Sequence, residues 1–282
     1  MVFLAGLLLL GATGISDDGI KISPDVMDIT KKYADGFGPQ AEAELRTLSR
    51  LGDSSASALL GELLMMRDRI GGPDFAGSCD YSEKAGQFSS ALHNLATCYF
   101  LGNGRPKDLT KSRDLYRQAA ELGFPKAKCA YGNMLVRGDG GPAEAARGVD
   151  LCRQAADTGL PDAQTDYAGY LLTGKHVPKD AVRARTYLQP AAEKGHANAA
   201  FLLAQIYWYG DGIEKNVPQA AIWWLTAYEK GRKDAAFWVG AAGFNQVLEG
   251  AKNKEPVASV FIDQARKWLA IASREDPDPK KA

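Results

Sequence analysis

The four cysteines are the residues of this chain whose type allows the widest range of chemistry, from metal binding to disulfide formation. They are Cys79, Cys98, Cys129 and Cys152. Structural zinc sites draw on cysteine and histidine ligands only a few residues apart, and no two of these cysteines are that close in sequence. The spacing argues against a zinc site. It leaves two alternatives: two disulfide bonds, or four buried thiols that pack as small hydrophobic side chains.

Other motifs for catalysis or cofactor binding are missing from the sequence. His93, His176 and His196 are scattered and form no H-E-x-x-H pattern. Residues 138–141 read Gly-Asp-Gly-Gly, but a phosphate-binding loop also needs a preceding strand and a Gly-Lys-Ser/Thr ending. There is no G-x-S-x-G nucleophile elbow. We therefore expect no catalytic residue, no metal and no cofactor, in a protein that is not an enzyme.

The composition is that of an ordinary folded protein. The 282 residues include 34 Lys+Arg and 34 Asp+Glu, so the formal net charge is zero, and 45% of the residues are hydrophobic. Disordered chains combine low hydrophobicity with high net charge, which this chain does not. A neutral chain also has no broad basic field, so we expect no nucleic-acid partner.

The N-terminal segment suggests export. Residues 1–10 are apolar and uncharged, and this run is too short for a membrane span, which needs roughly 20 residues. Its length fits the apolar region of a signal peptide over residues 1–14, with Ala12 and Gly14 as the small residues before the cleavage site. No basic residue precedes the run, so a short buried helix is the alternative. Export predicts a periplasmic or secreted protein, and a buried helix predicts a cytoplasmic one.

The elements that carry these residues are marked by glycines, which recur at intervals of 36 residues in two series. The series are Gly102, Gly138, Gly174 and Gly210, and Gly123, Gly159, Gly195 and Gly231. Residues before each glycine show the apolar spacing of a helix, and glycine commonly ends helices in the left-handed conformation. Each unit therefore predicts a pair of helices, and the units are residues 89–124, 125–160, 161–196 and 197–232. Because one pair cannot bury its apolar face alone, the pairs must stack into an all-α solenoid.

The repeat pattern weakens towards both ends, as expected of capping units. We predict a lead-in over residues 15–38, a half-repeat over 39–52 and a degenerate repeat over 54–88. After the four regular units, a degenerate repeat and a capping helix are expected over residues 233–273, where Gln246 replaces the expected glycine. A polar tail follows over residues 274–282.

Three features of the repeat match a known pattern: residues 99–104 (Tyr-Phe-Leu-Gly-Asn-Gly), residues 119–123 (Ala-Ala-Glu-Leu-Gly) and the spacing of Ala199, Tyr207, Gly210 and Trp224. In these residues the chain resembles the Sel-one-like repeat (SLR) family, which is related to the tetratricopeptide repeats. It implies a right-handed α/α superhelix of antiparallel helix pairs that acts as a protein-binding adaptor. Some cysteine-rich relatives are described as binding penicillin or weakly hydrolysing β-lactams. This chain has neither S-x-x-K nor Lys-Thr-Gly, which disfavours a β-lactam-directed hydrolase.

The predicted helices place the cysteines in two pairs. Cys79 and Cys98 lie on neighbouring antiparallel helices at similar distances from the turn between them, and so do Cys129 and Cys152. Both pairings are geometrically feasible if the side chains face each other. The alternative of four buried thiols stays open at this point.

The tryptophans indicate where a partner could bind. All 5 lie late in the sequence, and most match positions that pack between helices. Trp208 and Tyr209 differ, because the corresponding positions of earlier units mix polar and apolar residues, as a partly exposed surface does. We predict that Trp208, Tyr209 and Trp238 form an aromatic patch, since aromatic residues often dominate binding energy at interfaces.

These features favour a non-enzymatic interaction scaffold of the bacterial envelope or the secreted space. Its partner would be a protein or peptide on the concave surface of the solenoid. The alternative is an envelope adaptor that recognises glycan or peptidoglycan fragments of the cell wall, which the aromatic patch would also suit. Specificity resides in surface side chains on a generic scaffold, so the partner's identity does not follow from the fold.

Overall fold

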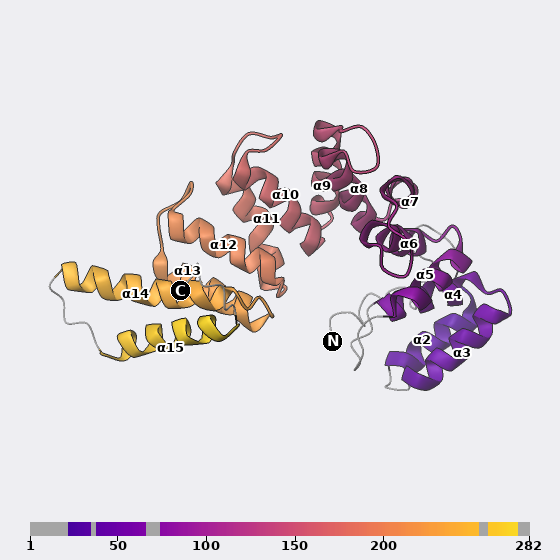
Figure 1. Ribbon diagram of the computed structural model, residues 1–282, viewed down its shortest axis with the longest axis horizontal. Coiled ribbons are helices and arrows are strands. Elements are labelled where there is room, and N and C mark those ends of the chain that lie inside the picture. The colour runs from indigo at the N-terminus through magenta and orange to yellow at the C-terminus, as the bar shows by residue number, and fades with distance from the viewer. Residues whose placement is uncertain (1–21, 35–37, 66–73, 254–258, 276–282) are drawn as a thin grey trace. The chain divides into compact units, whose positions relative to one another are not determined.

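The computed structural model describes residues 22–34, 38–65, 74–253 and 259–275 (Figure 1). The predicted signal peptide over residues 1–14 and most of the predicted polar tail lie outside these residues. The chain divides into two compact units, Met1–Leu151 and Cys152–Ala282. The described residues form helices and their connections, without a strand, and neighbouring helices along the chain pack in pairs. The predicted all-α solenoid of stacked helix pairs is thereby confirmed.

The first unit begins with helices that precede the regular repeat. Its helices are α2 (Pro24–Ala34), α3 (Gly38–Arg50), α4 (Ser54–Met65), α5 (Phe75–Ala85), α6 (Ser89–Leu101), α7 (Leu109–Glu121) and α8 (Pro125–Arg137). Helix α9 (Ala145–Asp157) crosses the division between the units. Helix α2 lies within the segment that the sequence analysis left as a lead-in. Its Val26 and Ile29 are buried together with Leu45 of α3, so this helix belongs to the N-terminal core.

The second unit continues the same alternation and ends in two longer helices. Its helices are α10 (Pro161–Thr173), α11 (Ala181–Glu193), α12 (Ala197–Tyr209), α13 (Val217–Glu229), α14 (Ala235–Lys252) and α15 (Ser259–Glu275). The eight helices from α6 to α13 are each 13 residues long. Helix α14 has 18 residues, because Gln246 stands where a helix-ending glycine would be. We call α6, α8, α10, α12 and α14 the first helices of their repeats.

The helix ends are set by glycine in both series. Each first helix of the four regular repeats is followed by a glycine with positive φ, and at Gly102 (φ 79°) the amide donates to the Cys98 carbonyl. The second helices end in a different turn. The Gly123 amide (φ 93°) donates to the Ala120 carbonyl and the next amide donates to Ala119, which is the paired hydrogen bonding of a Schellman motif. Glycine is needed here because other L-residues pay about 1 kcal/mol or more for this conformation.

The connection between the two helices of a repeat is equally regular. In the first repeat the Asp108 amide donates to the Tyr99 carbonyl at 2.9 Å, and the Asp108 carboxylate accepts from the Lys111 amide at 2.9 Å. Asp180 and Asn216 cap their helices in the same way. These side chains satisfy amide groups that the first turn of a helix leaves without a partner.

Small residues allow the helices to approach closely. The alanines that recur in the repeat register are fully or almost fully buried. They include Ala91, Ala127, Ala163, Ala199 and Ala235 on the first helices and Ala119, Ala155, Ala191 and Ala227 on the second. Their side chains leave the space that neighbouring helices fill, so the core runs along each unit as a series of interhelical layers.

Among the described residues, no helix combines the length and the apolar character that crossing a bilayer requires.

Candidate binding surface

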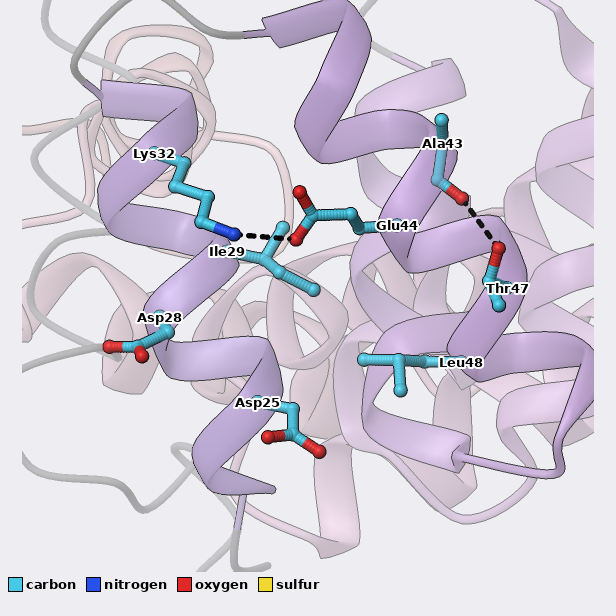
Figure 2. A pocket seen from close by; sticks show the side chains of 8 residues that line it. All are labelled: Asp25, Asp28, Ile29, Lys32, Ala43, Glu44, Thr47 and Leu48. Carbon is cyan, nitrogen blue, oxygen red and sulfur yellow. Dashed lines mark hydrogen bonds and ion pairs between the residues drawn. The ribbon is translucent and has the colours of Figure 1, made fainter.

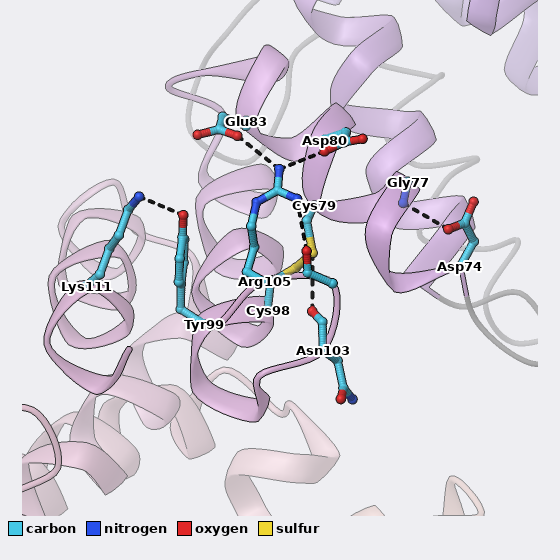
Figure 3. A network of polar contacts seen from close by, with 11 residues as sticks. Asp74, Gly77, Cys79, Asp80, Glu83, Cys98, Tyr99, Asn103, Arg105 and Lys111 are labelled. Atoms are coloured by element: carbon cyan, nitrogen blue, oxygen red, sulfur yellow. Dashed lines mark hydrogen bonds and ion pairs between the residues drawn. A yellow bond between two sulfur atoms is a disulfide. The ribbon is translucent and has the colours of Figure 1, made fainter. Parts of the chain in front are cut away.

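A disulfide bond joins the first regular repeat to the degenerate repeat before it. Cys79 on α5 and Cys98 on α6 are bonded, with their Cα atoms 6.3 Å apart, and both side chains are buried (Figure 3). The linker after α6 passes over this bond, since the Asn103 carbonyl oxygen lies 3.5 Å from the Cys79 sulfur. Arg105 in the same linker bonds Asp80 at 2.7 Å and Glu83 at 3.0 Å. The hydrogen bonds that Arg105 donates to Asp80 and, with a smaller effect, to Glu83 raise the pKa of Arg105. The linker is therefore anchored on α5.

The other two cysteines are also disulfide-bonded. Cys129 and Cys152 are both buried, and none of the four cysteines, all within the described residues, carries a free thiol. A sulfur in a disulfide neither attacks a substrate nor binds a metal as a thiolate. The cysteines thus act as cross-links.

A histidine, a threonine and an aspartate meet at the start of α12, in an arrangement that superficially resembles a hydrolytic triad. His196 Nδ1 lies 2.9 Å from Thr165 Oγ1, and its Nε2 lies 2.9 Å from Asp162. However, Nδ1 also accepts the Ala199 amide at 3.2 Å, which makes His196 the cap of α12. The Thr165 hydroxyl donates to the Pro161 carbonyl at 2.7 Å and is buried. The group caps a helix and does not present a nucleophile to solvent.

The other two histidines do not form a metal site. His93 packs against the rings of Tyr116 and Phe124, with centroids 5.2 and 5.4 Å away. His176 lies in an exposed linker. Within the described residues, no group of three or more His, Cys, Asp or Glu side chains is arranged to hold a metal ion.

The hollow between α2 and α3 is open to solvent and is lined by both charged and apolar residues (Figure 2). Its volume is about 480 Å³, and Lys32 and Glu44 form an ion pair at 2.8 Å across it. Asp25 and Asp28 lie at its margin. Lys32 is paired with Glu44, and Lys31 is paired with Asp28 at 3.4 Å. Nothing in this arrangement provides a nucleophile or a buried polar anchor.

The tryptophans assemble around one buried ring in the second unit. Trp224 of α13 is fully buried, and Trp208 of α12 packs against it with ring centroids 5.4 Å apart. Trp238 of α14 stacks on Trp224, with ring centroids 5.2 Å apart and an interplanar angle of 26°. Phe201 contacts both Trp224 and Trp238, and Phe237 contacts Trp238. We call Trp208, Trp224, Trp238, Phe201 and Phe237 the tryptophan cluster.

The structure thus brings together two of the three residues of the predicted aromatic patch. Trp208 and Trp238 are both half-buried and are joined through Trp224 rather than directly. The third, Tyr209, is 65% exposed and is the last residue of α12. Two cations cover part of the cluster: Lys215 lies 5.4 Å above the Trp208 ring, and Arg232 lies 3.6 Å above the Phe201 ring.

Two further exposed apolar residues of the second unit were missed by the sequence analysis. Phe244 (52% exposed) and Leu248 (44% exposed) lie on α14 four residues apart, and therefore on one face of that helix. Phe244 could have been identified from the sequence, because it follows Trp208 by one repeat length and therefore occupies the same repeat position. Leu248 could not be identified in this way, because the regular repeat has no helix at its position. We call Tyr209, Phe244 and Leu248 the apolar edge.

The accessible faces of the first helices in this unit change character along the chain. On α10 the accessible side chains include Asp162, Asp166 and Thr173, and on α12 they include Leu202 and Tyr209. Helix α14 presents Trp238, Phe244 and Leu248. Exposed polar residues remain on α12 and α14, namely Asn198, Gln246 and Glu249, but large exposed apolar side chains appear only on these two of the three helices. Such side chains can bind apolar groups of a partner, since exposed apolar groups gathered on a surface mark interaction sites.

The fold is found in other proteins of known structure. A Sel1 repeat protein from Oxalobacter formigenes superposes with a TM-score of 0.70 at 24% identity, over 91% of this chain and 100% of that one. The protein c5321, a protective antigen of uropathogenic Escherichia coli with an SLR fold, gives a TM-score of 0.62 at 22% identity, over 97% of this chain and 62% of that one. The immunity protein Pa5087 of Pseudomonas aeruginosa gives 0.50 at 23% identity, over 80% of this chain and 83% of that one. These similarities show the fold.

No curated protein matches the chain by sequence. The family model described as the Sel1 repeat matches four consecutive segments, residues 89–124, 125–160, 161–196 and 197–231. The resemblance noted from the sequence is confirmed, and the chain belongs to the Sel1 repeat family.

Proposed function

We propose that this protein is an interaction scaffold of the bacterial envelope or the secreted space, and that it binds a partner protein through the tryptophan cluster and the apolar edge. Sel1 repeat proteins are generally protein-interaction scaffolds. The observation that carries the proposal is the accessible apolar face of α12 and α14, where Tyr209 and Phe244 are more than half exposed. Exposing such side chains to water is unfavourable, and a partner that covers them recovers the hydrophobic free energy.

The tryptophan cluster supports this site because it makes the face rigid. Trp208 and Trp238 are held on the fully buried Trp224, so they lose little conformational freedom when a partner binds. Pre-organised aromatic residues are typical of the positions that dominate binding energy.

The disulfides support the proposed location. Both cysteine pairs are bonded, and disulfide bonds persist mainly in oxidising compartments such as the periplasm. The location can be tested by alkylating thiols in intact cells before lysis. The proposal expects all four cysteines to be protected until a reductant is added, whereas four alkylated cysteines without reductant would contradict export.

Partner binding is tested by capture on the immobilised full chain and identification of the captured proteins. The informative comparison is between Trp208→Ala and Phe100→Ala, because Phe100 occupies the same repeat position in the first regular unit. The proposal expects a stoichiometric partner that Trp208→Ala loses and Phe100→Ala retains. Equal retention by both variants would refute the site. Binding to isolated cell-wall material alone, with no protein partner, would refute the proposed partner class in favour of the glycan alternative.

A further inference from the structure

We propose that the partner segment places an apolar side chain on the apolar edge and a carboxylate on Lys215, so that Lys215 selects acidic partners. This inference rests on the proposed function and specifies the partner's chemistry. The occupant is a peptide segment of a partner protein, with aspartate or glutamate next to a large apolar residue.

The first step is the shape of α14. In the regular repeats the first helix ends at the glycine that follows it, as α12 does at Gly210. Helix α14 instead continues to Lys252. Its last two turns carry Leu248 beyond the point where α12 ends. Together with Phe244, which corresponds in the repeat to Trp208, this extension provides the apolar edge with a second helix.

The second step is the position of Lys215. Its ammonium group lies 5.4 Å above the Trp208 ring, and its charge contributes to lowering the pKa of Glu249 on α14, after the larger effect of the Lys252 hydrogen bond. Lys215 lies at the end of α12, because its backbone amide also packs on Gly210, the residue that follows Tyr209. A partner side chain on Tyr209 would therefore have its neighbouring residues close to this ammonium group.

The third step is the pairing of the surrounding charges. Lys179 is paired with Asp211 at 2.7 Å, and Lys252 is paired with Glu249 at 2.9 Å. Within the described part of the chain, Lys215 forms no ion pair, so it retains its capacity to bind a carboxylate. An ammonium group has three donors and can contact a ring face and a carboxylate together.

The charge complementarity therefore favours an acidic partner over a neutral or basic one. A carboxylate would find the unpaired Lys215, whereas a partner lysine beside the apolar edge would be repelled by it. Two carboxylates act against this preference: Glu214 is exposed in the same linker, and Glu249, which pairs with Lys252, lies in the field of Lys215, so the effect of Glu214 is measured separately.

The experiment is a selection of random dodecapeptides displayed on phage against the immobilised full chain. The inference expects the selected peptides to carry Asp or Glu beside aromatic residues or leucine. We expect Lys215→Glu to weaken the binding of a selected acidic peptide by about tenfold. Most of this loss should be a slower association rate, and the affinity should depend less on salt than it does for the unmodified chain. Lys107→Glu is the matched control, because Lys107 holds the same position in the first regular repeat, and it should leave the affinity unchanged. Glu214→Gln should not weaken binding.

The outcomes separate this inference from the proposed function. If Trp208→Ala abolishes peptide binding while the selected peptides show no acidic preference, or Lys215→Glu has no more effect than Lys107→Glu, the site stands and the charge selection is refuted. If the selected peptides bind Trp208→Ala as well as the unmodified chain, the proposed site itself is refuted. Selection of basic peptides would overturn the inference directly.

Discussion

The glycines of the linkers offer a graded test of how the repeat is held together. Gly123, Gly140 and Gly212 all have positive φ, at 93°, 71° and 71°. They differ in what an added methyl group would meet. At Gly123 there is nothing within 4 Å, at Gly212 the nearest atom is the end of the Val182 side chain at 2.8 Å, and at Gly140 the backbone of Leu109 is in the way, its carbonyl carbon 2.5 Å from the added Cβ.

The expected costs follow from these surroundings. Alanine at any of the three positions must adopt the left-handed conformation, which costs about 1–2 kcal/mol, partly offset by about 0.4–1 kcal/mol from the reduced entropy of the unfolded chain. Gly123→Ala should therefore lower the free energy of unfolding by about 1 kcal/mol. Gly212→Ala should lower the free energy of unfolding only slightly more than Gly123→Ala, because the Val182 side chain can rotate away from the added methyl group. Gly140→Ala should cost about 3 kcal/mol, since overpacking against a rigid backbone adds roughly 1–3 kcal/mol.

The measurement is urea denaturation of each full-length variant, followed by circular dichroism under non-reducing conditions. Circular dichroism is needed because all 5 tryptophans lie in the second unit, whereas Gly123 and Gly140 lie in the first. The variants are compared by their midpoints, provided that the slope of the transition is unchanged. If all three variants were destabilised equally, local backbone strain alone would explain them. The close packing of each linker on the preceding second helix would then not contribute to stability.

Three further predictions concern stability. Replacing Cys79 and Cys98 together by serine should lower the free energy of unfolding by about 3 kcal/mol, because the loop that they close spans 19 residues. Adding reductant should then lower the denaturation midpoint of this variant less than that of the unmodified protein. Burial opposes ionisation of Asp53, but hydrogen bonds from Ser55, Ser23 and the Ala56 amide lower its pKa overall; its stabilising effect should be present above about pH 4 and lost as the pH falls through the lowered pKa. Asp53→Asn should flatten this acid limb in pH-dependent denaturation, and an unchanged limb would contradict the assignment. His176 has φ 66° where the two neighbouring repeats have glycine, so His176→Gly should leave the free energy of unfolding unchanged or raise it by up to about 1 kcal/mol. A clear loss of stability would show that the His176 side chain has a structural role.

The regular part of the fold could be predicted because its signals are local and repeated. A glycine such as Gly102 ends a helix through its own backbone conformation, and an equivalent glycine occurs in each of the four regular repeats. Asp108 likewise caps the helix that it begins. The irregular ends lack this redundancy. Helix α2 was not predicted. The extension of α14 past Gln246 results from a missing helix-ending glycine, and a missing signal is harder to recognise in a sequence than one that is present.

The candidate site was predictable only in part, because its contacts depend on how helices are rotated against each other. The variable repeat positions of Trp208 and Tyr209 indicated a surface. They did not indicate that Trp208 and Trp238 meet on Trp224, since that contact joins three helices. Lys215 carries no motif, and its position over the Trp208 ring is a property of the folded linker.

The two ends of the regular repeat are secured by different means. Linear arrays of repeats unfold most readily at their ends, where each unit has one neighbour instead of two. At the first regular repeat, the Cys79–Cys98 bond ties α6 to the irregular unit before it. At the other end, Tyr228 replaces the alanine of the earlier units, packs edge-on against Trp268 of α15 with centroids 5.1 Å apart, and bonds Glu275 at 2.9 Å.

This difference bears on where binding occurs. A covalent cross-link fixes a junction whatever its surroundings, whereas aromatic packing contributes only as long as its rings stay buried. The apolar edge lies on α12 and α14, next to helices that depend on packing rather than on the Cys79–Cys98 cross-link. A partner that covers Tyr209 and Phe244 would therefore stabilise the C-terminal end as well as bind to it, because any ligand of the folded state raises its stability. Partner binding should protect the amides of α14 from hydrogen exchange more than those of α6.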